Sequence, residues 1–256
     1  MPATSAMTMP ACVHGVILDG DPPPDREWLP RELPRLSSPP TEGLYLHWDG
    51  AALALCRAGD RHSLHLTVDF LDAASRRRHA RATVAREQLA RACGLRRQAG
   101  RTIVDATAGL GRDTFLLATL GAHVTAVERS PVITALLGDG LRRAALAPET
   151  SPVVERITLI TGDARSLPPA LQPEVVYLDP MYQAAGRKAL AGKEMQLLQA
   201  LLGPDADADT LLAAALATAG ERVVVKRHRH APPLAGHRPH HCLEGRSTRF
   251  DVYVTS

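Results

Sequence analysis

The chain has 256 residues, of which 45% are hydrophobic, and this length suits one large α/β domain with a smaller appendage. Its formal net charge of +3 at pH 7 does not by itself argue for a nucleic-acid partner. The four cysteines form no Cys-x-x-Cys pair, no apolar run approaches the roughly 20 residues of a membrane span, and no signal-peptide pattern opens the chain. We therefore expect a cytoplasmic protein with free thiols and no membrane association.

The N-terminal part of the chain changes character near residue 40. Residues 1–40 are rich in proline and predict an extended or poorly ordered lead-in, in which residues 16–18 suit a short strand. Residues 41–98 predict a small subdomain. Alternating apolar residues at 44–48 and 52–56 flank an Asp49-Gly50 turn, and the alternation returns at 63–70. This pattern favours an antiparallel sheet.

Residues 72–97 carry many arginines against two acids, Asp72 and Glu87. These arginines are Arg76, Arg77, Arg78, Arg81, Arg86, Arg91, Arg96 and Arg97. Val84 and Leu89 belong to an apolar face and Gly94 suits a C-cap, so we expect one basic helix. Such a helix is either a solvated surface or a patch that contacts phosphates, and the nearly uniform sign of its charge favours the second interpretation.

From residue 99 to residue 256, strand-like and helical segments alternate, which predicts a parallel sheet in an α/β fold. The expected strands are 101–105, 123–127, 156–160, 174–178 and 222–226. Helices are expected at 114–120, from Ser130-Pro131 onward, near 193–202 and at 211–219. A late strand at 249–254 suits antiparallel pairing with its neighbour.

A glycine turn follows the first strand of this region. Asp105 ends the strand, and Gly109 and Gly111 precede the helix at 114–120. Glycines at such a turn permit positive φ and close approach of a ligand to the backbone. The pattern predicts a small molecule over a helix N-terminus, although a turn without a ligand is the alternative. Thr114 stands where the dinucleotide pattern G-x-G-x-x-G has its third glycine, which argues against a nicotinamide-dependent oxidoreductase.

Acids follow the next two strands. Glu128 ends the second strand, where a carboxylate grips ribose hydroxyls in nucleotide-binding α/β folds, and the alternative is a surface glutamate. Asp163-Ala164 follows the third strand. An aspartate there can accept a hydrogen bond from the adenine amine, and the next backbone N–H can serve a ring nitrogen. The alternative is a turn aspartate or a helix cap.

The tetrapeptide Asp179-Pro180-Met181-Tyr182 ends the fourth strand. It resembles the [DN]-P-P-[FYW] motif of methyltransferases that act on amino groups. In that motif a carboxylate or amide orients an exocyclic NH₂, a carbonyl beside proline accepts the second N–H, and an aromatic ring stacks on the base. Asp179, the Pro180 carbonyl and Tyr182 are the candidates for these catalytic roles, and a simple strand-terminating turn is the alternative.

Two further site classes are not indicated. The sequence lacks G-x-x-x-x-G-K-[ST], so a P-loop is not expected. Several of the eleven histidines gather after residue 227 without H-E-x-x-H or a matched cysteine set, so we expect surface histidines and no metal site.

Taken together, these residues resemble the RsmJ-type 16S ribosomal RNA (guanine-N2) methyltransferase family. The resemblance runs from about residue 63 to the end and is strong from residue 101. It is carried by 104–113, Glu128-Arg129, 175–181, Lys193-Glu194-Met195, 203–205, 207–209, 222–227, 231–234 and Arg249-Phe250-Asp251. This combination is far more specific than any single motif.

The resemblance implies a Rossmann-like class I methyltransferase sheet with a small N-terminal subdomain, and it implies S-adenosylmethionine as the cofactor. The implied cofactor contacts are Arg112, Asp113, Glu128, Arg129, Asp163, Ala164 and Asp179, which join Asp105, Gly109 and Gly111 of the glycine turn. The expected substrate is a guanine N2 amine in 16S ribosomal RNA, as free RNA or in the small ribosomal subunit. Our candidates for phosphate contacts are Arg76, Arg77, Arg78, Arg81, Lys226 and Arg227.

Three alternatives remain open at this point. The first is a methyltransferase that acts on another amine, in DNA or in a protein glutamine. The second is a non-catalytic RNA-binding module of the same fold. A nicotinamide-dependent oxidoreductase is the third class, and binding of S-adenosylmethionine rather than NADH separates it from the first two.

Overall fold

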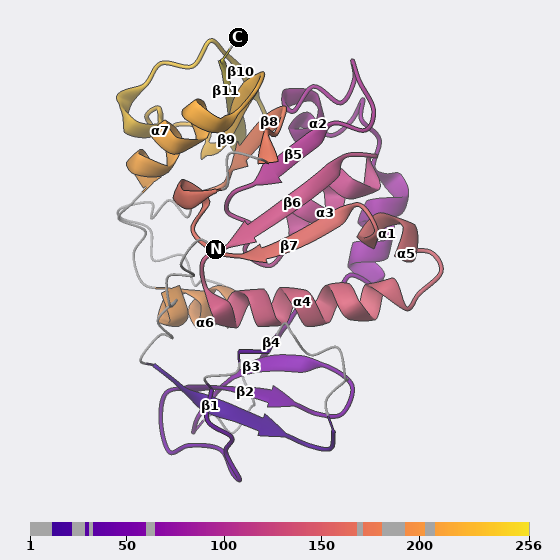
Figure 1. Ribbon diagram of the computed structural model, residues 1–256, viewed down its shortest axis with the longest axis vertical. Coiled ribbons are helices and arrows are strands. Elements are labelled where there is room, and N and C mark those ends of the chain that lie inside the picture. The colour runs from indigo at the N-terminus through magenta and orange to yellow at the C-terminus, as the bar shows by residue number, and fades with distance from the viewer. Residues whose placement is uncertain are drawn as a thin grey trace.

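A computed structural model describes residues 12–21, 29–30, 33–59, 65–167, 171–180, 193–202 and 208–255. Its described part contains a four-stranded sheet and a seven-stranded sheet. The long helix α4 (Pro131–Ala145) lies between the two sheets (Figure 1). Within the described residues, no helix is both long and apolar enough to cross a membrane.

The small sheet has the order β1 (Val13–Leu18), β2 (Leu44–Trp48), β3 (Leu53–Arg57) and β4 (His65–Thr67). The predicted hairpin is confirmed, because β2 and β3 pair antiparallel across a turn in which Asp49 Oδ1 accepts hydrogen bonds from the backbone of Ala51 and Ala52. β1 pairs parallel with β2, so the sheet is not wholly antiparallel as expected. The proline-rich segment therefore contributes a strand to this sheet.

The small sheet packs on α4 through apolar side chains. Leu46, Leu55 and Leu66 are fully buried and share one core cluster with α4 residues such as Ile133 and Leu137. Because successive residues of a strand face opposite sides, the alternation of β2 and β3 turns one face of the sheet toward this helix.

A buried carboxylate reinforces this junction. Asp139 of α4 has no exposed side-chain surface, and its Oδ2 accepts a hydrogen bond from the Leu53 backbone of β3 at 3.0 Å. Its two oxygens also pair with Arg142 at 3.0 Å and Arg143 at 2.9 Å. Arg142 in turn lies over the Trp48 ring of β2, with its guanidinium carbon 5.4 Å from the ring centroid. Asp139 thus links α4 to the small sheet.

Two helices stand where one basic helix was predicted, so that prediction was wrong. α1 (Ala73–Arg81) begins at Asp72, whose Oδ1 accepts from Ala74 and Ser75, and it ends at Ala82, which is extended. α2 (Gln88–Ala92) follows after a turn, and Gly94 adopts the predicted left-handed conformation with φ 79°. The extended Ala82 breaks the helix, and the arginines therefore lie on two helices rather than one continuous face.

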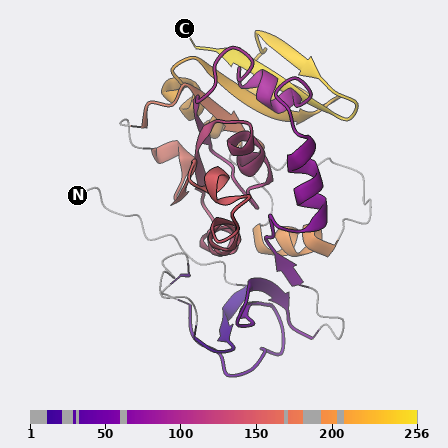
Figure 2. The ribbon, with the colours of Figure 1, turned by 90° about the vertical axis from the view of Figure 1, so that its right-hand side faces the viewer.

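The large sheet has the order β10-β11-β9-β8-β5-β6-β7. The parallel strands are β5 (Thr102–Asp105), β6 (His123–Glu128), β7 (Ile157–Thr161), β8 (Val175–Leu178) and β9 (Arg222–His228), close to their predicted positions. β11 (Thr248–Val254) pairs antiparallel with β9 as expected. β10 (His241–Glu244) was not predicted, and it forms the edge beside β11 (Figure 2).

Helices cover both faces of the large sheet. Ile103 of β5 packs in the cluster of α2 and α3 (Arg112–Thr119), and its neighbour Val104 packs with α7 (Ala208–Thr218) on the other face. The short helices α5 (Ser151–Val154), η2 (Ala164–Ser166) and η4 (Leu234–Gly236) and the helix α6 (Lys193–Leu202) complete the described elements. A parallel sheet covered on both faces explains the continuous apolar strands of the sequence.

We predict that Asp139→Ala lowers the free energy of unfolding by about 3 kcal/mol, because it leaves two largely buried guanidinium groups and the Leu53 N–H without their carboxylate. Glu149→Ala is the matched control. Glu149 pairs with Arg76 at 3.2 Å while both side chains are half-exposed, so its removal should cost less than about 1 kcal/mol. Urea denaturation measures both, and equal losses would contradict the role given to Asp139.

Candidate active site

The glycine turn connects β5 to α3 and is held by hydrogen bonds. The fully buried Asp105 carboxylate accepts from the Thr114 hydroxyl at 2.6 Å and from the Thr107 backbone at 3.3 Å. Gly111 has φ 74°, and a Cβ there would lie 2.4 Å from Leu137 of α4, so this position requires glycine. Thr114, which broke the dinucleotide pattern, thus ties the start of α3 to the end of β5.

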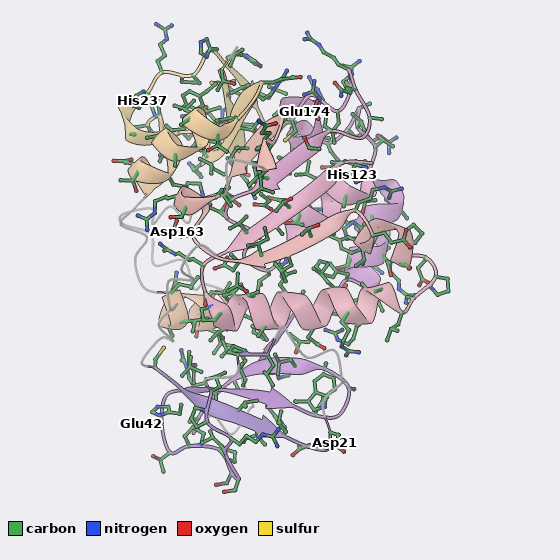
Figure 3. The ribbon with its side chains drawn as sticks, viewed as in Figure 1. Asp21, Glu42, His123, Asp163, Glu174 and His237 are labelled. Carbon is green, nitrogen blue, oxygen red and sulfur yellow. The ribbon has the colours of Figure 1, made fainter. Side chains whose placement is uncertain are left out.

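A pocket opens at the carboxyl ends of the parallel strands. It is bounded by the glycine turn and by the ends of β6, β7 and β8, and its lining includes Gly109, Glu128, Arg129, Asp163, Ala164 and Asp179. Figure 3 shows Asp163 at this end of the sheet, whereas His123, at the start of β6, lies at the opposite end. The predicted acids at three successive strand ends are therefore brought together.

Four of the predicted cofactor residues do not line this pocket: Asp105, Gly111, Arg112 and Asp113. Asp105 and Gly111 stabilise the conformation of the glycine turn through the contacts described above. Asp113, in the first turn of α3, faces Tyr177 and Lys226 instead. Neither the glycine-turn pattern, which gave Asp105 and Gly111, nor the family resemblance, which gave Arg112 and Asp113, distinguished residues that line the pocket from their neighbours.

Glu128 binds the glycine turn through both oxygens. Its Oε2 accepts from the Gly109 backbone at 3.0 Å, and its Oε1 accepts from the Ser130 backbone at 2.8 Å. Burial raises the pKa of the Glu128 carboxyl, and these two backbone donors partly offset that effect. The residue is 8% exposed, so Glu128 is not the surface glutamate of the alternative interpretation. Its ribose-binding role stays a prediction.

Asp163 has an ionic partner that the sequence analysis did not select. Its carboxylate pairs with the Arg165 guanidinium, whose Nε lies 3.0 Å from each oxygen, and accepts from the Arg165 backbone at 2.9 Å. Hydrogen bonding to Arg165 lowers the pKa of Asp163. The backbone bond also makes Asp163 the N-cap of η2, as its alternative interpretation proposed.

Apolar side chains form much of the remaining lining. They are Leu110, Ile133, Leu198, Leu202 and Leu211. Leu198 and Leu202 lie one turn apart on α6. Their i,i+4 spacing places them on one helix face, and this was the signal in the sequence that could have identified them as a pair of pocket residues. Apolar walls beside buried acids suit a flat heterocycle attached to a polar sugar.

A lysine joins two acids at the edge of the pocket. Lys226 of β9 donates from Nζ to Asp113 and to Asp179, with 2.8 Å to one oxygen of each. The Tyr177 hydroxyl donates to the same Asp113 oxygen at 2.7 Å. The Asp179 backbone N–H donates to the Thr107 hydroxyl at 2.6 Å, which fixes the end of β8 beside the glycine turn.

Charge and burial perturb the titration of this cluster. Burial raises the pKa of Asp179, the Lys226 ammonium lowers it, and the Asp113 carboxylate raises it, so the net pKa lies above the ordinary value. Burial lowers the pKa of Lys226, but Asp179 and Asp113 more than offset this and keep it protonated. Burial also raises the pKa of Asp105 to about 7, against the hydrogen bond from Thr114.

Two predicted phosphate contacts are placed differently by the structure. Lys226 is bonded to two carboxylates, so its charge is already compensated. Arg227 is 5% exposed and donates to the Pro232 carbonyl at 2.8 Å, because neighbouring residues of β9 face opposite sides of the sheet. These placements favour neither residue as a phosphate contact, and both RNA contacts stay predictions.

The remaining predicted site residues divide into two groups. Four arginines of α1 are exposed: Arg76, Arg77, Arg78 and Arg81. Arg78 reaches within 3.9 Å of Asp113 and so stands closest to the cluster described above. Pro180 is described and follows Asp179, whereas Tyr182 lies outside the described residues.

Two substitutions among the neighbours of Asp179 should shift its pKa in opposite directions. Lys226→Met removes the cation that lowers the pKa of Asp179 and should raise that pKa further. Asp113→Asn removes a neighbouring negative charge and leaves Lys226 to Asp179, so it should lower the pKa. Carboxyl ¹³C NMR titration of Asp179 measures both variants, and shifts in the same direction would contradict the cluster.

Asp105 should make stability depend on pH. Its pKa rises from an ordinary 3.8 to about 7 on folding, so between these values the folded state binds more protons than the unfolded state. The free energy of unfolding therefore falls as pH rises through this window, by on the order of a few kcal/mol. The asparagine of Asp105→Asn cannot ionise. The free energy of unfolding of this variant, compared with that of wild type, should therefore be higher at pH 8 than at pH 5. Parallel pH curves for the two proteins would refute this assignment.

Comparisons with known proteins identify the family. Residues 31–255 match the family described as "Putative SAM-dependent methyltransferase". The ribosomal RNA small subunit methyltransferase J of Thioalkalivibrio sulfidiphilus is 47% identical over 216 residues, which cover 83% of this chain and 85% of that protein. The protein of the same name from Alkalilimnicola ehrlichii is 46% identical over 254 residues, covering 94% and 95%.

A solved structure agrees with these sequence matches. The crystal structure of a SAM-dependent methyltransferase from Neisseria gonorrhoeae has a TM-score of 0.75 and 38% identity, and the match covers 94% of this chain and 96% of that one. Both the extent of the match and its identity exceed what a shared fold alone would give. The chain therefore belongs to the S-adenosylmethionine-dependent methyltransferase family that includes the proteins named ribosomal RNA small subunit methyltransferase J.

Proposed function

We propose that this enzyme transfers a methyl group from S-adenosylmethionine to the exocyclic N2 amine of a guanine in 16S ribosomal RNA. Its relatives bear the name ribosomal RNA small subunit methyltransferase J. The observation that carries the proposal is the Asp179 carboxylate, which lines the strand-end pocket and is bonded to Lys226. A carboxylate acceptor at this place suits an amino group rather than a hydroxyl or carbon nucleophile, because an amine has two N–H bonds to direct.

The pocket residues fit S-adenosylmethionine by their chemistry. The buried Glu128 has further acceptor capacity beside its two backbone donors and suits the ribose hydroxyls. Asp163 and the Ala164 backbone suit the adenine edge, and Leu198 and Leu202 suit the ring faces. Arg129 also lines the pocket and suits the carboxylate of the methionine part. S-adenosylmethionine, when bound, supplies an electrophilic methyl group on a sulfonium centre.

Asp179 and Pro180 would orient the guanine amine. The lone pair of an aryl amine is delocalised into the ring, so the neutral group is a weak nucleophile. Acceptance of one N–H by the Asp179 carboxylate and of the other by the Pro180 carbonyl favours a pyramidal nitrogen whose lone pair points at the methyl carbon. Orientation of nitrogen, methyl carbon and sulfur in line supplies much of the rate. Tyr182, outside the described residues, remains our candidate for stacking on the base.

Lys226 would keep Asp179 ready for this role. Burial alone would favour the protonated acid, which has lost acceptor capacity, and the ammonium at 2.8 Å opposes that protonation. Formation of the N–C bond, with the C–S electron pair leaving on sulfur, would give a cationic nitrogen that still bears its two original protons. Asp179 or water would then accept one of these protons, which leaves a neutral methylated amine.

The substrate site also constrains the partner. A guanine amine in a paired helix cannot enter a strand-end pocket, so the base must be unpaired or flipped. We infer that the RNA is presented as free 16S ribosomal RNA or within the small ribosomal subunit, in the cytoplasm. Methylation of DNA or of a protein glutamine is the competing outcome of the test below.

We predict that Asp179→Ala lowers the transfer rate at least about 100-fold, because it removes an oriented acceptor at the reacting group. Asp179→Asn keeps a carbonyl acceptor and should retain measurable activity, which separates orientation from proton removal. Transfer from labelled S-adenosylmethionine to 16S ribosomal RNA, small subunits, DNA and protein is the measurement. Thermal unfolding checks that the variants fold. Wild-type rates in Asp179→Ala, or label on DNA or protein alone, would refute the proposal.

A further inference from the structure

A second hollow lies beside the active-site pocket, between the helices α1 and α2 and the strands β9 and β11. We call it the arginine cleft, after the side chains of Arg78, Arg86 and Arg91 that line it. Figure 2 shows α2 next to the C-terminal strands, and α2 contacts β11 directly. The extended Ala82 that breaks the predicted basic helix therefore creates the two-helix wall of this cleft.

The cleft carries excess positive charge. Within the part of the chain that the structure describes, neither Arg86 nor Arg91 has a carboxylate within 4.0 Å. Glu87 and Asp113 are the acids in the lining, but Asp113 is bonded to Lys226, and Arg78 reaches it only at 3.9 Å. Uncompensated guanidinium groups in a concave surface attract anions, and they suit phosphate because its oxygens match the guanidinium fork.

The cleft and the active-site pocket share a wall. Asp113 lines the cleft, Asp179 lines the pocket, and the Lys226 Nζ atom lies 2.8 Å from an oxygen of each. A group held in the cleft is thus separated from the reacting amine by the width of one ion-pair cluster. That spacing is on the scale of neighbouring nucleotides in one strand.

The floor of the cleft is apolar and rigid. Leu89, Leu116 and Phe250 line it, and all three side chains are mostly buried. Gln88 donates from its amide to the Glu244 carbonyl at 2.7 Å, so α2 is fixed to the C-terminal strands. An apolar floor under a cationic rim suits a sugar and base beneath a phosphate better than it suits an inorganic ion.

We propose that the arginine cleft binds the phosphates of the RNA strand directly flanking the target nucleotide, with Arg86 and Arg91 as the principal contacts. This inference rests on the proposed function, because it names how the same substrate is held. It adds Arg86 and Arg91, two arginines of the basic segment, to the individually predicted phosphate contacts, of which Arg78 and Lys226 line the same cleft.

The test is the double variant R86A/R91A, with R96A/R97A as its matched control. Arg96 and Arg97 follow α2, are exposed and do not line the cleft. Their replacement by alanine removes the same number of positive charges as R86A/R91A. Binding of a 16S ribosomal RNA transcript and of small subunits is measured between 50 and about 300 mM salt. R86A/R91A should bind RNA about tenfold more weakly, and its slope of log K against log salt should fall by about 1.4. The control should stay within about twofold of wild type.

Three results would overturn the inference. Equal losses in the two double variants mean that charge acts without a defined cleft, and wild-type binding by R86A/R91A means that the cleft is not used. A loss confined to assembled subunits, with naked RNA bound normally, means that the cleft contacts a ribosomal protein. Binding is measured without methyl transfer, so failure of the wild-type enzyme to methylate RNA would refute the proposed function while leaving the cleft result intact. Unchanged thermal unfolding and S-adenosylmethionine affinity verify that the variants fold.

Discussion

The site depends on one ammonium group placed between two carboxylates. Lys226 Nζ is bonded to Asp113 of α3 and to Asp179 at the end of β8, so it connects three elements at the carboxyl edge of the sheet. Burial of carboxylates is costly unless a charge compensates it. A lysine suits this task because its compact ammonium donates in three directions, whereas the planar guanidinium of arginine prefers a single bidentate partner. The same contact separates the pocket from the arginine cleft.

A second set of hydrogen bonds shapes the pocket before any ligand enters. Glu128 accepts from Gly109 and Ser130, Thr114 donates to Asp105, and Thr107 accepts from the Asp179 backbone. These bonds tie the turn to β5, β6 and β8. A site that is fixed in this way spends less binding energy on ordering itself and can use more of it to orient the reacting groups.

The sequence predicted the sheet well because its strands are buried on both faces and therefore read as apolar runs. It predicted which acids stand at strand ends, since a strand's last residue is readable from the pattern. It did not distinguish Asp179, which lines the pocket, from Asp113, which does not, because that difference depends on which way an α3 side chain turns. The division of the basic segment at Ala82 and the burial of Arg227 were missed for the same reason: both follow from tertiary packing rather than local propensity.

The charge balance of the active-site edge follows from these placements. The Asp113 carboxylate acts to raise the pKa of both Asp105 and Asp179, and Lys226 is bonded to Asp113 and Asp179. Burial is the main cause of the raised pKa of Asp105, and the neighbouring carboxylates of Asp113 and Asp179 add to it. Of these acids, Asp179 lines the pocket in which we propose that the methyl donor binds, and Asp113 lines the arginine cleft in which we propose that the RNA strand binds. Lys226 thus holds one carboxylate of each hollow, and because a single ion-pair cluster joins the two proposed sites, their substrates would meet at Asp179.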